Sequence, residues 1–192
     1  EMDEAIGLLR ALGLVEGAVD LTAANNALSD SGTLAFYSPQ TESVYVRGTE
    51  MTPALEVTIA HELVHVLQDQ HFDLKRLPEL DPAAATKLRA VAEGDAGRIE
   101  DDYVNSVLSD DERDAYYEES MASYEESAGE LDESVPPAMS AMFASPYIFG
   151  PSLVDYLFAT GGDEAINAAL KDPPSEFALF DPINNPPESN LA

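Results

Sequence analysis

Apolar and polar residues follow two different spacings along this chain. Residues 33–37 and 43–47 are rich in β-branched and aromatic side chains, and the sequence SPQTE between them is typical of a turn. Two such runs around a short turn predict a β-hairpin. Over most of the remaining sequence, apolar residues recur every three or four positions, which predicts amphipathic helices.

The clearest helical pattern follows the hairpin and covers residues 52–72. Thr52 is a residue type that commonly caps a helix, and Pro53 fits the first helical position, where no backbone N–H is needed. At 3.6 residues per turn this helix has about five turns. One apolar stripe is expected along it, made of Leu55, Ile59, Leu63 and Val66.

A second long helix begins in the same way, because Asp81 and Pro82 repeat the pairing of a cap with proline. The sequence after this start keeps a regular helical spacing of apolar residues. The stripe that we expect on this helix consists of Leu88, Ala92, Ala96, Ile99 and Tyr103.

The rest of the chain is expected to be helical as well, except for its end. Helices are predicted over residues 2–12, 21–28, 109–134, 147–160 and 163–170, and Gly161 and Gly162 stop the fourth of these. The helix at 109–134 is strongly acidic with interleaved tyrosines, which is typical of a solvated helix with one aromatic face. From Asp172 on, prolines are frequent and periodicity is absent, so an extended tail is expected.

These elements predict an α+β fold that is mostly α-helical, with a small hairpin beside the first long helix. We expect a single domain over residues 1–192, because neither an internal repeat nor a clear linker divides the sequence. Its parts are the N-terminal helices (1–32), the hairpin with the two long helices (33–108), and the acidic helix, the following helix and the tail (109–192).

The charge of the chain is extreme, with 37 acidic residues, 9 basic residues and a net charge of −28. Nucleic acids and anionic membrane surfaces are poor partners for such a protein, because binding phosphates requires clustered Lys and Arg. No apolar run approaches the length of a membrane span. An acidic, lysine-poor surface suits high salt and is equally typical of an acidic secreted protein.

Cysteine is absent, which excludes disulfides, thiolate metal sites and cysteine nucleophiles. The first residue is Glu1 rather than Met. We expect an extracellular or cell-surface protein, and the sequence leaves open whether a signal peptide or anchor upstream has been removed.

Residues 61–65 read HELVH and lie inside the first long helix. Positions i and i+4 of a helix share one face, so His61 and His65 can offer two imidazole nitrogens to one ion. Glu62 then lies beside the ion, where it can take a proton from an attacking water. The alternative is an ordinary amphipathic helix with two half-exposed histidines. Because two of the chain's three histidines fall into this pattern, we favour the metal.

A catalytic zinc site usually has three protein ligands and one open position. The third histidine, His71, lies beyond the last clear helical turn and is expected at the surface or in a loop. Glu93 is the better candidate, because the second long helix can pack antiparallel to the first and bring this carboxylate to the histidines. Gly94 and Gly97 suggest a close approach to the first helix, since glycine is costly in a helix. Alternatively, Glu93 is one of many surface acids.

The strings HELVHVLQDQHFDL and AVAEGDA resemble the gluzincin metallopeptidases, which pair HExxH with a downstream Glu ligand. A third string, SPYIFGPSLVDYLFATGGDEAI, resembles the PYxxG segment of aminopeptidase-N-like members. A group of bacterial and archaeal neutral zinc metallopeptidases is similar to this chain over residues 33–174. The resemblance implies a minimal zincin-like fold, one zinc ion held by His61, His65 and Glu93, and Tyr147 as the donor that stabilises the oxyanion.

This resemblance implies zinc-dependent hydrolysis of peptide bonds in a peptide or protein substrate, with Glu62 as the general base. The sequence has no counterpart of the exopeptidase motif that grips a free amino terminus, which favours an endopeptidase. It departs from the group in the PPSEFALFDP stretch, where Phe180 or Asp181 stands in place of a His. The alternatives are a catalytically inactive domain that binds metal or another protein, and a structural domain that folds without metal.

Two further features would complete such a site. A ligand His normally donates its other ring nitrogen to an acceptor, and Asp69 or Asp95 could serve, although both could also be ordinary surface acids. The strand before the metal helix could pair with an extended substrate, or its edge could simply face solvent. Its residues are Val44, Tyr45 and Val46.

Overall fold

The computed structural model describes residues 7, 10–15 and 33–187, and side chains within these ranges except at 126–134. The expected helices at 2–12 and 21–28 therefore lie mostly or wholly outside the described residues. The chain forms two compact units. One comprises Glu1–Thr33 and Tyr117–Ala144, and the other comprises Leu34–Tyr116 and Ser145–Ala192.

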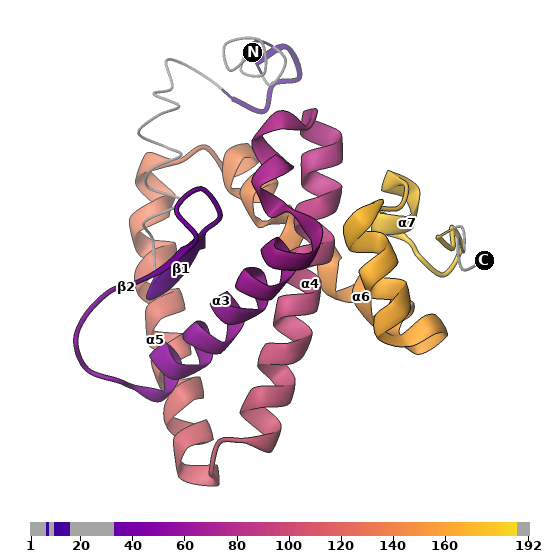
Figure 1. Cartoon of the computed structure of the whole chain (residues 1–192). Coiled ribbons are helices and arrows are strands. Elements are labelled where there is room, and N and C mark those ends of the chain that lie inside the picture. Colours follow the sequence, from indigo (N-terminus) through magenta and orange to yellow (C-terminus); the bar gives the residue numbers. More distant parts are fainter. Residues whose placement is uncertain (1–6, 8–9, 16–32, 188–192) are drawn as a thin grey trace. The chain divides into compact units, whose positions relative to one another are not determined.

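The described part of the chain is mostly helical with one small sheet, which confirms the predicted fold class (Figure 1). Within it, no helix is both long and apolar enough to cross a membrane. The elements are β1 (Ala35–Ser38), β2 (Ser43–Val46), α3 (Pro53–Phe72), the 3-10 helix η1 (Leu74–Glu79), α4 (Pro82–Ser106), α5 (Asp110–Ser134), α6 (Pro137–Lys171) and α7 (Glu176–Phe180).

Both long helices begin where the sequence predicts. The Thr52 side chain accepts a hydrogen bond from the backbone N–H of Leu55 at 3.3 Å, and Pro53 opens α3. Asp81 caps α4 through the N–H of Ala84 at 3.0 Å. These caps satisfy backbone donors that a helix start otherwise leaves open, and they fix the register of the two helices.

The buried face of α3 differs from the predicted apolar stripe. Leu55 is buried, but Leu63 is 51 % exposed. The buried face contains polar residues as well, namely Gln68 and Asp69. The stripe prediction is therefore wrong at Leu63, because α3 turns a partly polar face toward its neighbours.

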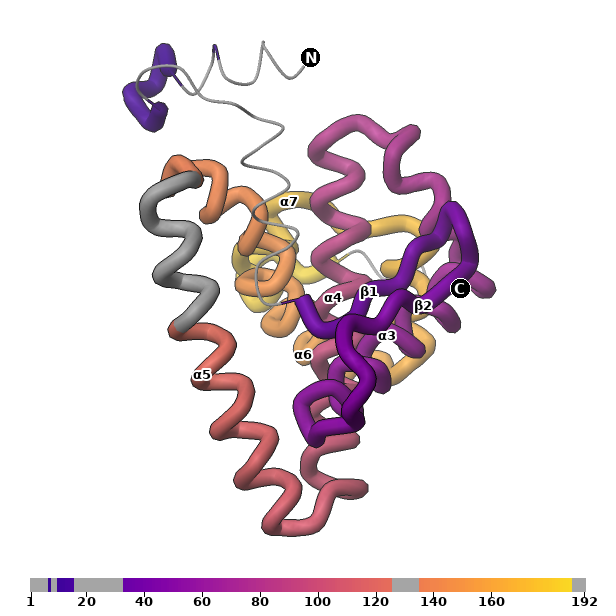
Figure 2. Tube along the Cα trace, turned by 90° about the vertical axis from the view of Figure 1, so that its left-hand side faces the viewer, coloured from indigo at the N-terminus to yellow at the C-terminus, as the bar shows by residue number. Residues whose placement is uncertain are grey.

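The main core lies between α4 and the second half of α6. Leu88, a member of the stripe predicted for α4, is fully buried in a cluster with Leu153 and Val154 of α6. α3 and α4 lie side by side in both views of the backbone (Figures 1 and 2). Thus α4 packs against α6 on its apolar face and against α3 on a face that carries carboxylates.

The hairpin is confirmed, with β1 and β2 antiparallel and Ala35 opposite Val46. β1 makes more extensive contact with α3 than β2 does. The turn between the strands contains Glu42 with a positive φ of 51°.

The C-terminal third departs from the prediction at two places. α6 begins at Pro137, well before residue 147. Its break at Gly162, whose φ of 63° and ψ of −157° are not helical, confirms the predicted stop at the glycine pair. The tail is not simply extended, since Ser175 caps the short helix α7. Leu179 of α7 packs into the main core, so burial of apolar side chains orders a proline-rich segment that has no long periodicity.

Candidate metal centre

Two neighbouring helices bring together the three predicted metal ligands. His61 and His65 lie one turn apart on α3, and their Nε2 atoms are 3.2 Å from each other. Oε2 of Glu93, on α4, lies 3.4 Å from each of these nitrogens. Among the described residues, this is the one group of three His, Cys, Asp or Glu side chains whose donor atoms converge in this way.

The three separations fit a tetrahedral metal site. Ligand bonds of about 2.0–2.1 Å to zinc place neighbouring donor atoms about 3.3–3.4 Å apart in a regular tetrahedron. The observed values are 3.2, 3.4 and 3.4 Å. Charge-assisted hydrogen bonds are shorter, at about 2.7–2.9 Å. The donor set therefore matches the edges of a coordination shell better than it matches direct ion pairs.

The second ring nitrogens of the two histidines have different acceptors. Nδ1 of His61 donates to Oε2 of Glu100 at 2.8 Å, whereas Nδ1 of His65 donates to Oε1 of Gln68 at 2.9 Å. These bonds leave the two Nε2 atoms directed toward Glu93. Sequence reasoning missed both acceptors, although the seven-residue spacing of Glu93 and Glu100 places them on one helix face.

The two predicted acceptors, Asp69 and Asp95, do not contact the imidazoles. Asp69 accepts hydrogen bonds from the Tyr37 hydroxyl at 2.8 Å and from the backbone N–H of Lys75 at 3.2 Å. Asp95 accepts from Nε2 of Gln68 at 3.0 Å, so it orients the amide that holds His65. In place of a direct bond to His65, Asp95 therefore acts through Gln68.

Glu62 lies on the same helix and faces the hairpin. Its Oε2 accepts a hydrogen bond of 2.7 Å from the backbone N–H of Tyr37 in β1. Because that N–H points away from β2, the edge of the sheet that faces the site belongs to β1. The predicted substrate strand, with Val44, Tyr45 and Val46, is one strand spacing of about 4.8 Å further away, so the geometry favours β1 in its place.

Tyr147 lies on α6 and reaches the metal ligands from a third helix. Its hydroxyl lies near the carboxylate of Glu93. Burial of the hydroxyl raises the pKa of Tyr147, and so does the negative charge of Glu93. The whole residue is nevertheless 50 % exposed, so its ring borders the open side of the site.

A contact between two glycines sets the distance between α4 and α6. A Cβ on Gly150 would lie 2.2 Å from the carbonyl oxygen of Ala90, and one on Gly94 would lie 2.5 Å from the backbone of Gly150. The prediction that Gly94 and Gly97 serve the approach to α3 is thus wrong. Gly94 serves the contact with α6, and a Cβ on Gly97 would meet nothing within 4 Å.

The charges of the site favour a cation between the three ligands. Burial lowers the pKa of His61, but hydrogen bonds with Glu100 and Glu93 outweigh this effect and raise it to about 10. Burial raises the pKa of Glu93, yet its bonds with His61 and His65 lower it to about 2. Burial raises the pKa of Glu62. The carboxylates that hold a proton on the imidazoles would equally attract a metal ion.

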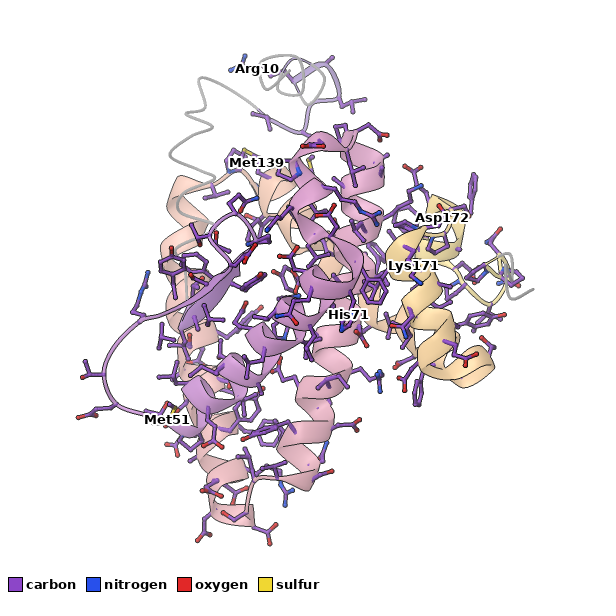
Figure 3. All side chains as sticks on the ribbon, viewed as in Figure 1. Arg10, Met51, His71, Met139, Lys171 and Asp172 are labelled. Atoms are coloured by element: carbon purple, nitrogen blue, oxygen red, sulfur yellow. The ribbon has the colours of Figure 1, made fainter. Side chains whose placement is uncertain are left out.

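The remaining candidates are His71, Phe180 and Asp181. His71 is exposed in the last turn of α3, as expected of a surface residue (Figure 3). The Lys171 ammonium lies 5.9 Å from the ring of Phe72, the residue after His71. Phe180 is 62 % exposed, and its ring contacts Phe149 edge to face at 4.7 Å. Asp181 bonds to Asn184 just after α7.

Comparison of the chain with protein-family models, with curated proteins and with solved structures gives no match.

Proposed function

We propose that this chain is a zinc-dependent peptidase of the gluzincin type with a minimal zincin-like fold. One zinc ion would be held by His61, His65 and Glu93. The observation that carries the proposal is the set of separations of 3.2, 3.4 and 3.4 Å between their donor atoms. Two imidazoles and one carboxylate suit zinc, whereas magnesium and calcium prefer shells made of oxygen alone.

When bound, zinc would supply a Lewis acid that polarises the scissile carbonyl and makes a water nucleophilic near neutral pH. Glu62 is the general base. It follows His61 directly in the helix, and its partial burial raises the pKa of the carboxyl, as suits a group that exchanges protons. Glu62 takes a proton from the attacking water and passes it to the leaving amine.

Tyr147 stabilises the negative charge that develops on the carbonyl oxygen. Its hydroxyl already lies beside the ligand set, because the carboxylate of Glu93 is its neighbour in this structure. The close contact of Gly94 with Gly150 supports this role, since it brings α6 against the helix that carries Glu93. A preorganised donor of this kind contributes to the transition state without reorganising during the reaction.

An extended peptide or protein is the substrate class that fits this arrangement. The edge of β1 lies beside Glu62, as the bond from the Tyr37 N–H shows. Strand addition along this edge would bring a scissile bond next to the general base, provided that the substrate displaces this N–H from Glu62. We infer that the enzyme cleaves internal peptide bonds of its substrate, because the resemblance includes no motif that binds a free amino terminus.

Metal analysis combined with a hydrolysis assay tests the proposal. We expect one zinc ion per chain and cleavage of an unfolded substrate such as casein. Glu62→Gln should keep the zinc and lower hydrolysis by about 100- to 10,000-fold, since an amide cannot accept the proton. A wild-type chain that binds zinc but cleaves no peptide would indicate the inactive binding domain, and one without zinc would contradict both functions.

A further inference from the structure

The two histidines of the site are held unequally. His61 donates to a carboxylate, Glu100, at 2.8 Å, and His65 donates to an amide, Gln68, at 2.9 Å. A carboxylate is the stronger acceptor, because it is charged. The two imidazoles therefore differ in how firmly they are oriented.

Both oxygens of Glu100 are engaged. Oε2 accepts from His61, and Oε1 accepts from the hydroxyl of Tyr116 at 2.8 Å. The side chain of Glu100 is 26 % exposed, so water competes only in part for these bonds. With one bond to α3 and one to α5, the carboxylate on α4 has little freedom to rotate.

Tyr116 is itself held by apolar contacts. It packs against a small cluster of Val57, Val104 and Leu108, which come from α3, α4 and the turn before α5. This packing brings the hydroxyl to Glu100 from the second turn of α5. A chain of contacts therefore leads from the apolar cluster through Tyr116 and Glu100 to the ring of His61.

The spacing along α4 explains how one helix serves both sides of the same imidazole. Glu93 and Glu100 are seven residues apart, which places them within about 20° of each other around the helix. Glu93 faces the Nε2 atom of His61, and Glu100 faces its Nδ1 atom.

We propose that Glu100 and Tyr116 are positioning residues for the metal site. Glu100 keeps the proton of His61 on Nδ1 and directs the Nε2 lone pair at the ion. Tyr116 fixes Glu100 in the orientation that does this. The inference rests on the proposed zinc site and adds a role for α5, which carries no metal ligand.

Zinc affinity measured by competition with a chelator provides the first test. Glu100→Gln should weaken zinc binding by about 10- to 100-fold, as is usual when a ligand loses its orienting carboxylate. Tyr116→Phe should weaken it less, because Glu100 still contacts His61. Asp101→Asn is the control for Glu100→Gln, since it removes an exposed carboxylate from the neighbouring position.

Tyr103→Phe is a matched control for Tyr116→Phe. Tyr103 belongs to the same apolar cluster, and its hydroxyl donates to Glu56, a carboxylate for which the structure shows no bond to either histidine. If the hydroxyl of Tyr116 mattered only for folding, both variants would change zinc affinity alike. We expect zinc affinity to fall only in the Tyr116 variant.

The NMR signal of the His61 Nδ1–H in the metal-free protein tests the orientation without any metal. In Glu100→Gln this signal should move upfield or vanish through exchange with water, whereas Tyr103→Phe should leave it in place. Unchanged zinc affinity and an unchanged signal in Glu100→Gln would overturn the inference. A wild-type chain without zinc would instead contradict the proposed function, so the two failures are distinguishable.

Discussion

α4 and α5 are successive helices of 25 residues each, and both are rich in carboxylates, yet they use them in opposite ways. α4 has seven buried residues, whereas none of residues 110–125 of α5 is buried. The side chain of Glu93 on α4 is 11 % exposed, while that of Asp110 on α5 is 93 % exposed. The first contacts two imidazoles, and the second makes a surface ion pair with Arg113.

The contrast shows that an acidic composition does not by itself locate function. A carboxylate excluded from water must be paired, because leaving it unpaired costs several kcal/mol. Glu93 and Glu100 meet this requirement with histidines, whereas most acids among residues 110–125 of α5 are exposed to solvent and do not need such a partner. α4 packs against other helices on two faces, so its buried acids, unlike the exposed acids of α5, are the ones placed to bind a metal ion or orient its ligands.

The largest effect is expected from removing a buried acid of α4. Glu93→Ala should abolish both zinc binding and peptide hydrolysis, since two imidazoles alone do not make the three-ligand site of a zinc enzyme. The corresponding change on α5, Glu118→Ala, should alter neither. Zinc content and casein cleavage of both variants measure this difference. Full zinc occupancy in Glu93→Ala would remove Glu93 from the ligand set.

The tyrosines extend the comparison to hydroxyl groups. Tyr147→Phe should lower turnover by about 100- to 1000-fold, with zinc content intact and substrate binding little changed, because an oxyanion donor acts on the transition state. Tyr124 on α5 is 71 % exposed, and Tyr124→Phe should leave turnover unchanged. Near-normal turnover in Tyr147→Phe would make Tyr147 a packing residue.

Sequence alone predicts the features that depend on neighbouring residues. The caps at Thr52 and Asp81 and the hairpin follow from local hydrogen bonds and side-chain types, and the structure confirms them. The predicted ligands His61, His65 and Glu93 also come together, because two of them share a helical turn and the third follows on the next helix.

Features that depend on contacts between residues far apart in the sequence could not be predicted from the sequence alone. Glu100 has the spacing of a second inward-facing acid, but its role requires knowing which ring nitrogen of His61 faces α4. The partner of Gly94 is Gly150, 56 positions later, and nothing near Gly94 distinguishes α6 from α3 as the neighbour. The short helix α7 is stabilised by the burial of Leu179 in the core, against residues that are distant in the sequence.

A smaller effect, on stability, is expected from the glycines of α4 and α6. Gly150→Ala should destabilise the fold by about 1–3 kcal/mol, because its new Cβ would overlap the carbonyl oxygen of Ala90. Gly97→Ala should stabilise the fold by about 0.4–1 kcal/mol, since its Cβ meets nothing and alanine favours the helix. Urea unfolding of the two variants measures whether the free energy of unfolding falls in Gly150→Ala and rises in Gly97→Ala. A stable Gly150→Ala variant would show that α4 and α6 are further apart in solution.

The smallest effect is expected on the exposed face of α5. Met121 is 61 % exposed, and glutamine has nearly the same helix propensity, so Met121→Gln should change the free energy of unfolding by no more than about 0.5 kcal/mol. Gly150→Ala, measured in the same urea titration, is the positive control. A loss above about 1 kcal/mol would mean that Met121 is covered in solution. Repeating the titration at several protein concentrations would then show whether a second copy of the chain covers it, because only association makes the unfolding midpoint depend on concentration.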